Sequence, residues 1–203
     1  MYYDIFVSKF RKSKEAVLGR IVDSLDSEPG RILDVGCGTG LDSVFLGLDN
    51  LKTSIVGLDF SPQMLRRALK RTDRRGLKNI EYVLGERDRL PFQDSSFDAY
   101  VCLNGFTEGD NYYGVNQDIT KRIIVGARLD DALKVLRVSG RMFLSLPMWN
   151  VEDCGEAYIK YEKNCWRDLA RYSRFVDVNV SDIRIVNGDS KPYTCLFVSG
   201  RKE

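Results

Sequence analysis

The stretch ILDVGCGTG, residues 32 to 40, runs strand-forming residues into glycines at positions 36, 38 and 40. Glycine has no side chain, so such a loop lets the backbone come close to a ligand. A dinucleotide fingerprint, G-x-G-x-x-G, needs a glycine where this chain has Leu41, and the Gly-Lys-Ser/Thr of a phosphate loop is absent. Asp34 precedes the loop, where its charge would repel a pyrophosphate and attract a cation. The loop therefore predicts a ligand with a positive group.

A second acid, Asp59, ends the strand-like segment TSIVGLD, residues 53–59. Nucleotide-binding folds place an acid at this point to bind both ribose hydroxyls. The two acids together suit a nucleoside that carries a cationic arm. S-adenosylmethionine has both parts, adenosine for Asp59 and an ammonium for Asp34, and we expect it as the cofactor.

Strand-like and helix-like segments alternate along the chain, which favours an α/β fold with a mainly parallel sheet. Ser61 as N-cap, Pro62 at the first helical position and Gly76 at the end delimit one helix. The apolar run 97–104 suits a strand buried on both faces. Two segments around NGDSKP predict a C-terminal antiparallel hairpin. The other expected strands are residues 31–35, 53–59, 79–84 and 140–146, and the other expected helices lie at 17–25, 41–48, 129–136 and about 158–172.

Four segments resemble, in order and spacing, the signature blocks of class I S-adenosylmethionine-dependent methyltransferases: ILDVGCGTG, VGLDFSPQML, LGERDRLPFQDSSFDAYVC and DALKVLRVSGRMFLS. The similarity covers about residues 31–146 and is greatest to the branch that includes ubiquinone and menaquinone biosynthesis methyltransferases. It implies a Rossmann-like three-layer α/β/α fold with a seven-stranded mixed sheet whose last strand is antiparallel. We expect a single methyltransferase domain over residues 1–203, with the cofactor above the carboxyl ends of the strands.

The resemblance also implies a role for each matching residue. Asp34 would neighbour the methionine ammonium, and Asp59 would bind the ribose. The loop residues that would line the cofactor are Gly36, Cys37, Gly38 and Gly40, and those along the adenine are Phe60 and Met64. Two of these have a simpler explanation, because Cys37 also suits a small loop filler and Met64 also falls on the apolar face of its helix.

The third block departs from the usual pattern, since relatives often show Gly-Asp-Ala-Glu where this chain has Gly85-Glu86-Arg87-Asp88. Glu86 keeps a carboxylate that can accept from the adenine amino group. The backbone amide of Arg87 can still contact adenine while its side chain points to solvent. In the fourth block, Val138-Ser139-Gly140 replaces Pro-Gly-Gly and keeps a glycine where a turn needs it.

The methyl acceptor is expected beside three segments: an N-terminal helix and lid at residues 1–28, and loops at 105–117 and 147–157. The candidate substrate-binding residues are Phe10, Asn104, Phe106, Tyr112, Tyr113 and Trp149. The candidate catalytic residues are Glu108, Asp110, Tyr112 and Tyr113, although a solvated loop residue explains each acid more simply. In-line methyl transfer relies on alignment of the reactants, so no acid or base is strictly required.

The chain has no histidine, and its five cysteines are scattered without a Cys-x-x-Cys pair. This composition argues against a metal site and excludes Ser-His and Cys-His nucleophile pairs. No apolar run approaches the ~20 residues of a membrane span. We therefore expect a cytoplasmic protein without metal.

Residues 61–89 hold nine Lys or Arg against four Asp or Glu. The basic residues fall mostly off the apolar face of the helix, so we interpret them as a solvated surface rather than an RNA-binding patch. The first functional hypothesis is methyl transfer to a small-molecule acceptor, without a nucleic-acid partner. Two alternatives stay open: a catalytically silent domain that binds S-adenosylmethionine as a sensor or partner, and an RNA methyltransferase.

Overall fold

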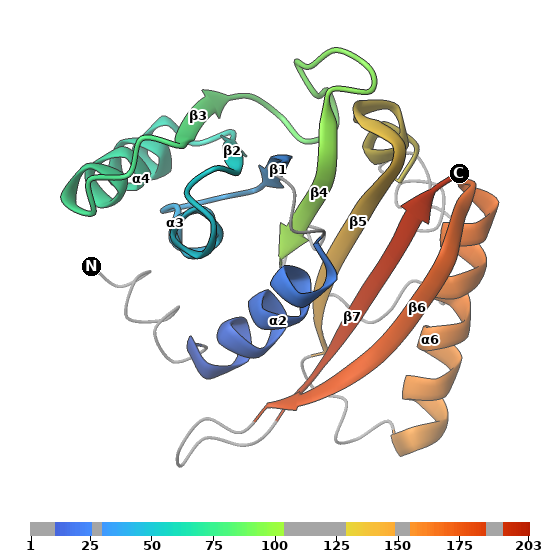
Figure 1. Cartoon of the computed structure of the whole chain (residues 1–203). Coiled ribbons are helices and arrows are strands. Elements are labelled where there is room, and N and C mark those ends of the chain that lie inside the picture. The colour runs from blue at the N-terminus through green and yellow to red at the C-terminus, as the bar shows by residue number, and fades with distance from the viewer. Residues whose placement is uncertain (1–10, 26–29, 104–128, 149–154, 186–192) are drawn as a thin grey trace.

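A computed structural model describes residues 11–25, 30–103, 129–148, 155–185 and 193–203. Helices and strands alternate along these residues, as the hydrophobic pattern predicts (Figure 1). The helices are α2 (Arg11–Ser24), α3 (Leu41–Asp49), α4 (Pro62–Arg74) and α6 (Gly155–Tyr172), and residues 129–135 are also helical. The strands are β1 (Arg31–Val35), β2 (Ser54–Asp59), β3 (Ile80–Leu84), β4 (Phe97–Leu103), β5 (Leu136–Met148), β6 (Phe175–Ile185) and β7 (Tyr193–Lys202).

The strands form one seven-stranded sheet in the order β3-β2-β1-β4-β5-β7-β6. All pairs from β3 to β5 are parallel, whereas β7 runs antiparallel to both β5 and β6. The predicted mixed sheet and C-terminal hairpin are therefore confirmed. The strand order reverses beside β1, because β2 and β3 lie on one side of it and all later strands on the other. Open sheets of this kind bind ligands at the carboxyl ends of the strands, next to such a reversal.

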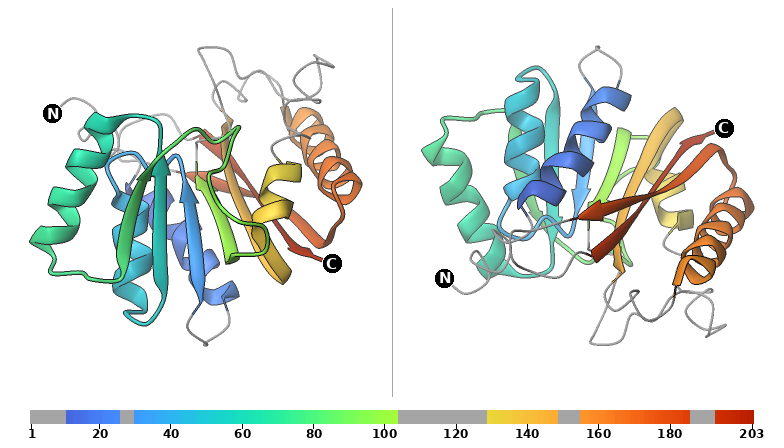
Figure 2. Two further views of the ribbon diagram at one scale, coloured as in Figure 1. Left: turned by 90° about the horizontal axis from the view of Figure 1, so that it is seen from above. Right: turned by 90° about the horizontal axis from the view of Figure 1, so that it is seen from below.

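Helices cover both faces of the sheet, as Figure 2 shows from two sides. On one face α2 and α3 pack over a core that includes Ile21 and Val44. On the other face α6 and the helix at residues 129–135 contribute Trp166 and Leu129 to a second core. The central strand β4 is buried almost throughout, as its apolar run predicts. Among the described helices, none has the length and apolar character needed to cross a membrane.

Helix α4 begins and ends where the sequence predicts. The Ser61 hydroxyl accepts a hydrogen bond from the backbone N–H of Met64 at 3.4 Å, and Pro62 occupies the first turn. Gly76 follows the helix with a left-handed φ of 66°. Because Ser61 comes two residues after Asp59, the first turn of α4 lies next to the carboxyl end of β2.

β5 begins at Leu136, four residues before the predicted start, because it leaves the preceding helix directly. The left-handed conformation in this stretch falls on Ser139, with φ 63°, and not on Gly140. An added Cβ on Gly140 would lie 2.8 Å from the carbonyl oxygen of Arg137. Gly140 is therefore required by the close approach of the backbone, and the expectation that it supplies the turn is wrong.

Candidate functional site

The loop of residues 36–40 joins β1 to α3 at the point where the strand order reverses. Gly36, Gly38 and Gly40 have φ values of 72°, 55° and 72°, so all three are left-handed. A residue with a side chain would pay about 1–2 kcal/mol in this conformation. Alternate glycines are thus what the backbone of this loop requires, and Gly40 then forms the N-cap of α3.

The backbone N–H groups of this loop are used inside the protein. Those of Gly36 and Cys37 both donate to the carbonyl oxygen of Leu58, at 2.8 and 3.0 Å. The N–H of Gly38 donates to Asp59 Oδ2 at 2.8 Å, and the N–H of Gly40 donates to the carbonyl of Cys37 at 2.9 Å. A phosphate cradle needs backbone N–H groups that point at the ligand. Four of the loop's amides already have partners, which agrees with the absence of a phosphate-binding motif.

Three carboxylates lie around the loop, and all are almost completely buried. Asp34, Asp42 and Asp59 are 1%, 5% and 7% exposed. Burial raises the pKa of the Cys37 thiol far above its ordinary value, and the charges of Asp34, Asp59 and Asp42 raise it further. The environment of the loop is therefore electronegative and attracts a cationic group.

Asp34 and Asp59 are held in different ways. Asp34 Oδ2 accepts from the Ser43 hydroxyl at 2.5 Å, and this residue is only 1% exposed. The two oxygens of Asp59 accept from the backbone N–H groups of Gly38 and Ser61, at 2.8 and 2.9 Å. A carboxylate has about four acceptor sites. Asp59 can thus hold the loop and still accept from two ligand hydroxyls.

The third glycine of the loop faces the interior. An added Cβ on Gly40 would lie 2.4 Å from the Tyr82 hydroxyl oxygen and 2.9 Å from Cβ of Ala68. Gly57 on β2 packs against the same ring, where an added Cβ would lie 2.6 Å from Tyr82 Cδ1. The sequence analysis did not identify Tyr82 as a residue that packs against the loop. The available signal is its hydroxyl, which needs a hydrogen-bond partner when the ring is buried.

Arg71 joins α4 to the same loop. Its Nη1 donates to the carbonyl oxygen of Thr39 and, at 2.7 Å, to the Thr39 hydroxyl. Unlike the neighbouring cations of α4, this guanidinium is turned inward. The sequence pattern assigned it to the solvated basic face, so its contact with the glycine loop was not foreseen.

The residues expected along the adenine surround the end of β2. Phe60 is 77% exposed, Met64 is half-buried in the first turn of α4, and Glu86 is exposed. The N–H of Gly85 donates to the backbone carbonyl of Asp59 at 3.1 Å, which brings the third block next to the second. The side chain of Arg87 is only 18% exposed, so the expectation that it points to solvent is wrong.

Residues 32–119 match the family model described as a methyltransferase domain. The chain is 36% identical over 107 residues to a demethylmenaquinone methyltransferase of Deinococcus radiodurans, covering 53% of this chain and 44% of that protein. It is 33% identical over 111 residues to one of Thermus thermophilus, covering 54% and 50%. Its fold is similar to that of an S-adenosylmethionine-dependent methyltransferase from Methanosarcina mazei, with TM-score 0.67 and 19% identity over 90% of this chain and 96% of that one.

These similarities join the chain, over its first half to two thirds, to S-adenosylmethionine-dependent methyltransferases. This confirms the resemblance carried by the four sequence blocks. The chain spans about half the length, or less, of the two curated relatives named here. Within its described ranges, no three His, Cys, Asp or Glu side chains gather as a possible metal site.

The predicted acceptor side of the chain lies mostly outside the described residues. Of the lid segment 1–28, the structure describes α2 and Leu25, and of the segment 147–157 it describes only the two ends. The loop 105–117 is not described. The predictions that fall outside concern Phe10, Asn104, Phe106, Glu108, Asp110, Tyr112, Tyr113 and Trp149.

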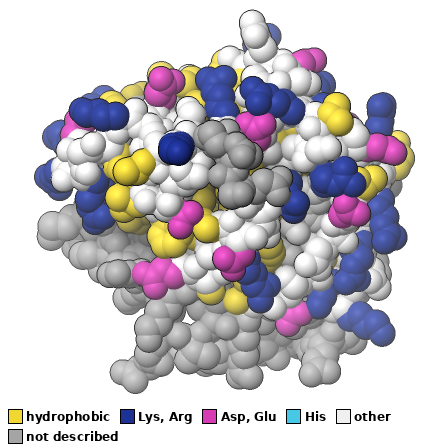
Figure 3. Space-filling model, in the orientation of Figure 1, with side chains coloured by type: hydrophobic (Ala, Val, Ile, Leu, Met, Phe, Trp, Pro, Cys, Tyr) yellow, Lys and Arg dark blue, Asp and Glu magenta, His cyan; other side chains and the backbone are white. Residues whose placement is uncertain are grey.

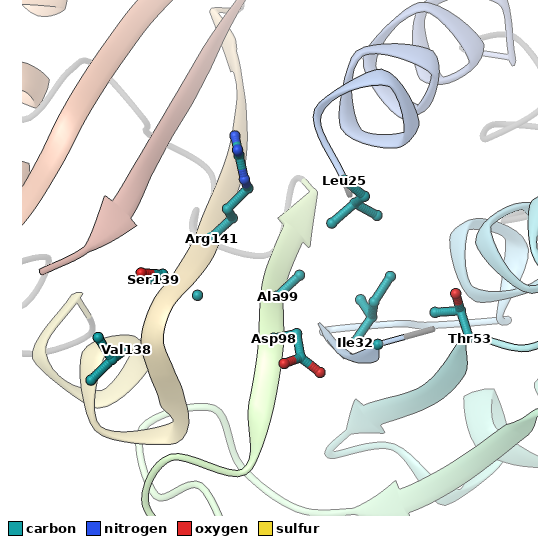
Figure 4. A pocket seen from close by; sticks show the side chains of 10 residues that line it. Leu25, Ile32, Thr53, Asp98, Ala99, Val138, Ser139 and Arg141 are labelled. Carbon is teal, nitrogen blue, oxygen red and sulfur yellow. The ribbon is translucent and has the colours of Figure 1, made fainter. Parts of the chain in front are cut away.

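A cavity of about 240 Å³ lies at the opposite edge of the sheet, among the amino ends of β1, β4 and β5 (Figure 4). Its carboxylate, Asp98, accepts from the N–H of Arg31 at 2.7 Å and from Arg137 Nη1 at 3.0 Å. Asp98 therefore joins neighbouring segments of the sheet. The lining residues are Leu25, Gly30, Ile32, Thr53, Asp98, Ala99, Val138, Ser139, Gly140 and Arg141.

Proposed function

We propose that this chain binds S-adenosylmethionine at the carboxyl ends of β1–β3 and transfers its methyl group to a small-molecule acceptor. The observation that carries the proposal is the loop of residues 36–40. Four of its five amides donate hydrogen bonds within the protein, and Asp34, Asp42 and Asp59 lie around it. This combination disfavours the phosphates of a dinucleotide and favours a ligand that carries an ammonium and a sulfonium. The match of residues 32–119 to a methyltransferase domain supports the same cofactor.

The residues at this edge suit the parts of that cofactor. The free acceptor sites of Asp59 suit the two ribose hydroxyls, and the charge of Asp34 suits the ammonium. Phe60 offers an exposed ring, and Glu86 an exposed carboxylate, for the adenine. The remaining proposed contacts are Gly36, Cys37, Gly38, Gly40, Met64 and Arg87.

Methyl transfer depends mainly on the alignment of the acceptor atom with the methyl group and the sulfur. When bound, S-adenosylmethionine supplies a methyl group on a positively charged sulfur, which is already a good leaving group. The chain then has to hold the acceptor in line and exclude water, and such positioning is worth about 7–11 kcal/mol of the barrier. We assign the acceptor walls and any base to the residues predicted around the segments 105–117 and 147–157.

The acceptor class rests on the relatives. The two curated relatives are named for demethylmenaquinone, which makes this compound the first acceptor to test. Purified protein would be incubated with S-adenosylmethionine labelled in the methyl group and demethylmenaquinone, and then with a metabolite extract. We expect label in a small molecule. Cofactor binding without transfer to any compound would instead favour the catalytically silent sensor.

The cofactor itself is tested by calorimetry. S-adenosylmethionine and S-adenosylhomocysteine should bind, and NADH should show no measurable binding because its pyrophosphate meets buried carboxylates and no free amide cradle. Tight NADH binding would refute the electrostatic argument from Asp34 and Asp59.

RNA is a second candidate acceptor because of one observation on α4. Arg66, Arg67, Lys70, Arg74 and Arg75 are exposed, and no ion pair is recorded for any of them in the part of the chain that the structure describes. Figure 3 shows Lys and Arg side chains gathered over α4. RNA affinity should be measured at several salt concentrations. A slope of only about one or two phosphate contacts would favour a solvated helix face.

A further inference from the structure

Helix α4 is joined to the candidate cofactor site at both of its ends. At its start, the backbone N–H of Ser61, the N-cap, donates to Asp59 Oδ1 at 2.9 Å. Near its end, Arg71 Nη1 donates to the carbonyl oxygen of Thr39 and, at 2.7 Å, to the Thr39 hydroxyl. Thr39 lies within the glycine loop and is 2% exposed, so the half-buried guanidinium reaches a buried part of the loop.

These contacts form a closed ring of bonds. Asp59 Oδ2 accepts from the backbone N–H of Gly38 at 2.8 Å, and Gly38 is the residue directly before Thr39. The ring therefore runs from Asp59 through the loop to Arg71, and then back along α4 to Ser61 and Asp59. Because Gly38 and Thr39 share a peptide bond, a shift of Thr39 moves the N–H that Asp59 accepts.

The loop also packs against α4 beside this contact. An added Cβ on Gly40 would lie 2.9 Å from Cβ of Ala68, which is one turn before Arg71. Apolar packing is not directional, so it limits how closely the loop approaches the helix without fixing individual polar groups. The two hydrogen bonds from Arg71 are directional and fix both oxygens of Thr39.

We propose that Arg71 is a positioning residue for the cofactor, acting through Thr39 and Gly38 on the carboxylate of Asp59. This role rests on the proposed function, in which the remaining acceptor sites of Asp59 bind the two ribose hydroxyls. Arg71 touches no ligand in this role. It keeps the Gly38 N–H in place on the carboxylate, so that the ribose site is formed before the ligand binds. Such preorganisation raises affinity because less ordering is needed on binding.

The affinity for S-adenosylhomocysteine tests this role. The net charge of this ligand is zero, so removal of a cation acts on it only weakly. Equilibrium dialysis would compare the unmodified protein with Arg71→Met, which removes both hydrogen bonds to Thr39, and we expect about three- to tenfold weaker binding. Arg71→Lys should recover part of the loss, because one nitrogen makes both bonds and an ammonium can also donate twice.

Combination with Asp59→Asn shows whether Arg71 acts through Asp59. If it does, Arg71→Met should weaken binding by less than about twofold in the Asp59→Asn background, because the carboxylate that it positions is already absent. A residue that only stabilises the fold would reduce affinity equally in both backgrounds, or in neither.

Two controls separate the contact from charge and from stability. Arg74→Met removes an exposed cation from the same helix and should leave the affinity unchanged. Asn79 Nδ2 donates to the carbonyl oxygens of Gly47, Asn50 and Thr53 at 3.0, 3.4 and 3.0 Å, at the far end of α3. Asn79→Ala should therefore lower the melting temperature and leave the affinity unchanged.

Three results would each overturn the positioning role: an affinity of Arg71→Met within about twofold of the unmodified protein, an equal loss with and without Asp59→Asn, or a similar loss in Arg74→Met. If Arg71→Met does not fold in either background, Thr39→Val, which removes the hydroxyl acceptor and keeps the carbonyl, decides by the same comparisons. Failure of the unmodified protein to bind S-adenosylhomocysteine would refute the proposed function, and the role of Arg71 with it. Binding by the unmodified protein together with any of the three results above would refute the role of Arg71 alone.

Discussion

Replacing Asp59 with asparagine tests how one carboxylate holds both the loop and the ribose. In the free protein its two oxygens accept from Gly38 and Ser61 at 2.8 and 2.9 Å. Asparagine keeps one acceptor oxygen and turns an NH₂ group toward the other backbone donor. A hydrogen bond to a charged group contributes about 1.5–3 kcal/mol, so unfolding should become easier by about that amount.

Asp59→Asn should also weaken the cofactor. The lone pairs left for the ribose hydroxyls are reduced by half, and the loss of one charge-assisted bond corresponds to about a ten- to hundredfold lower affinity for S-adenosylhomocysteine. Calorimetry measures the affinity, and urea unfolding of the free protein measures the stability. Both should fall in the same variant.

Asp98→Asn is the control, because Asp98 also accepts two hydrogen bonds, from Arg31 and Arg137, but at the opposite edge of the sheet. It should lower stability and leave cofactor affinity unchanged. An affinity of Asp59→Asn within about threefold of the unmodified protein would refute the assignment of Asp59 to the ribose.

Three further predictions follow from the same structure. Gly40→Ala should destabilise the protein by about 2–4 kcal/mol through its left-handed φ and the clash with Tyr82, and adding Tyr82→Phe should recover part of this in urea unfolding; a loss below about 1 kcal/mol would contradict the packing argument. Cys37 should resist iodoacetamide in the folded protein near neutral pH and react in urea, because burial and three carboxylates raise its pKa, as peptide mass spectrometry would show; modification of the folded protein would contradict this. The hydrogen bond from Lys163 lowers the pKa of Asp182 below 3.8. The pair therefore stabilises the folded protein above pH 3.8, and this stabilisation is lost as the pH falls through the lowered pKa. Lys163→Met should therefore lower the free energy of unfolding, measured in urea, by up to about 1 kcal/mol near neutral pH and not at all in strong acid; an equal decrease at both pH values would contradict this.

Local sequence determined most of the secondary structure and the chemistry of the loop. The apolar run of β4 predicts a strand buried on both faces, and Ser61, Pro62 and Gly76 predict both ends of α4. These signals are local, since capping and hydrophobic periodicity depend on residues a few positions apart. Alternate glycines with Asp34 and Asp59 predict a cation-bearing ligand in place of a phosphate for the same reason. The antiparallel last strand came from the family resemblance together with the hairpin pattern.

Only the tertiary structure decided how these parts touch. Gly40 was expected to line the cofactor, and the structure places the ring of Tyr82, 42 positions further along the chain, in the space its side chain would need. Arg71 turns inward to Thr39, and the buried Asp34 accepts a hydrogen bond from Ser43. No local pattern encodes such contacts, because they depend on how β1, β3, α3 and α4 pack around one point. The sequence determined which charges stand at the carboxyl edge of the sheet, and packing between distant segments decided which groups hold each of them.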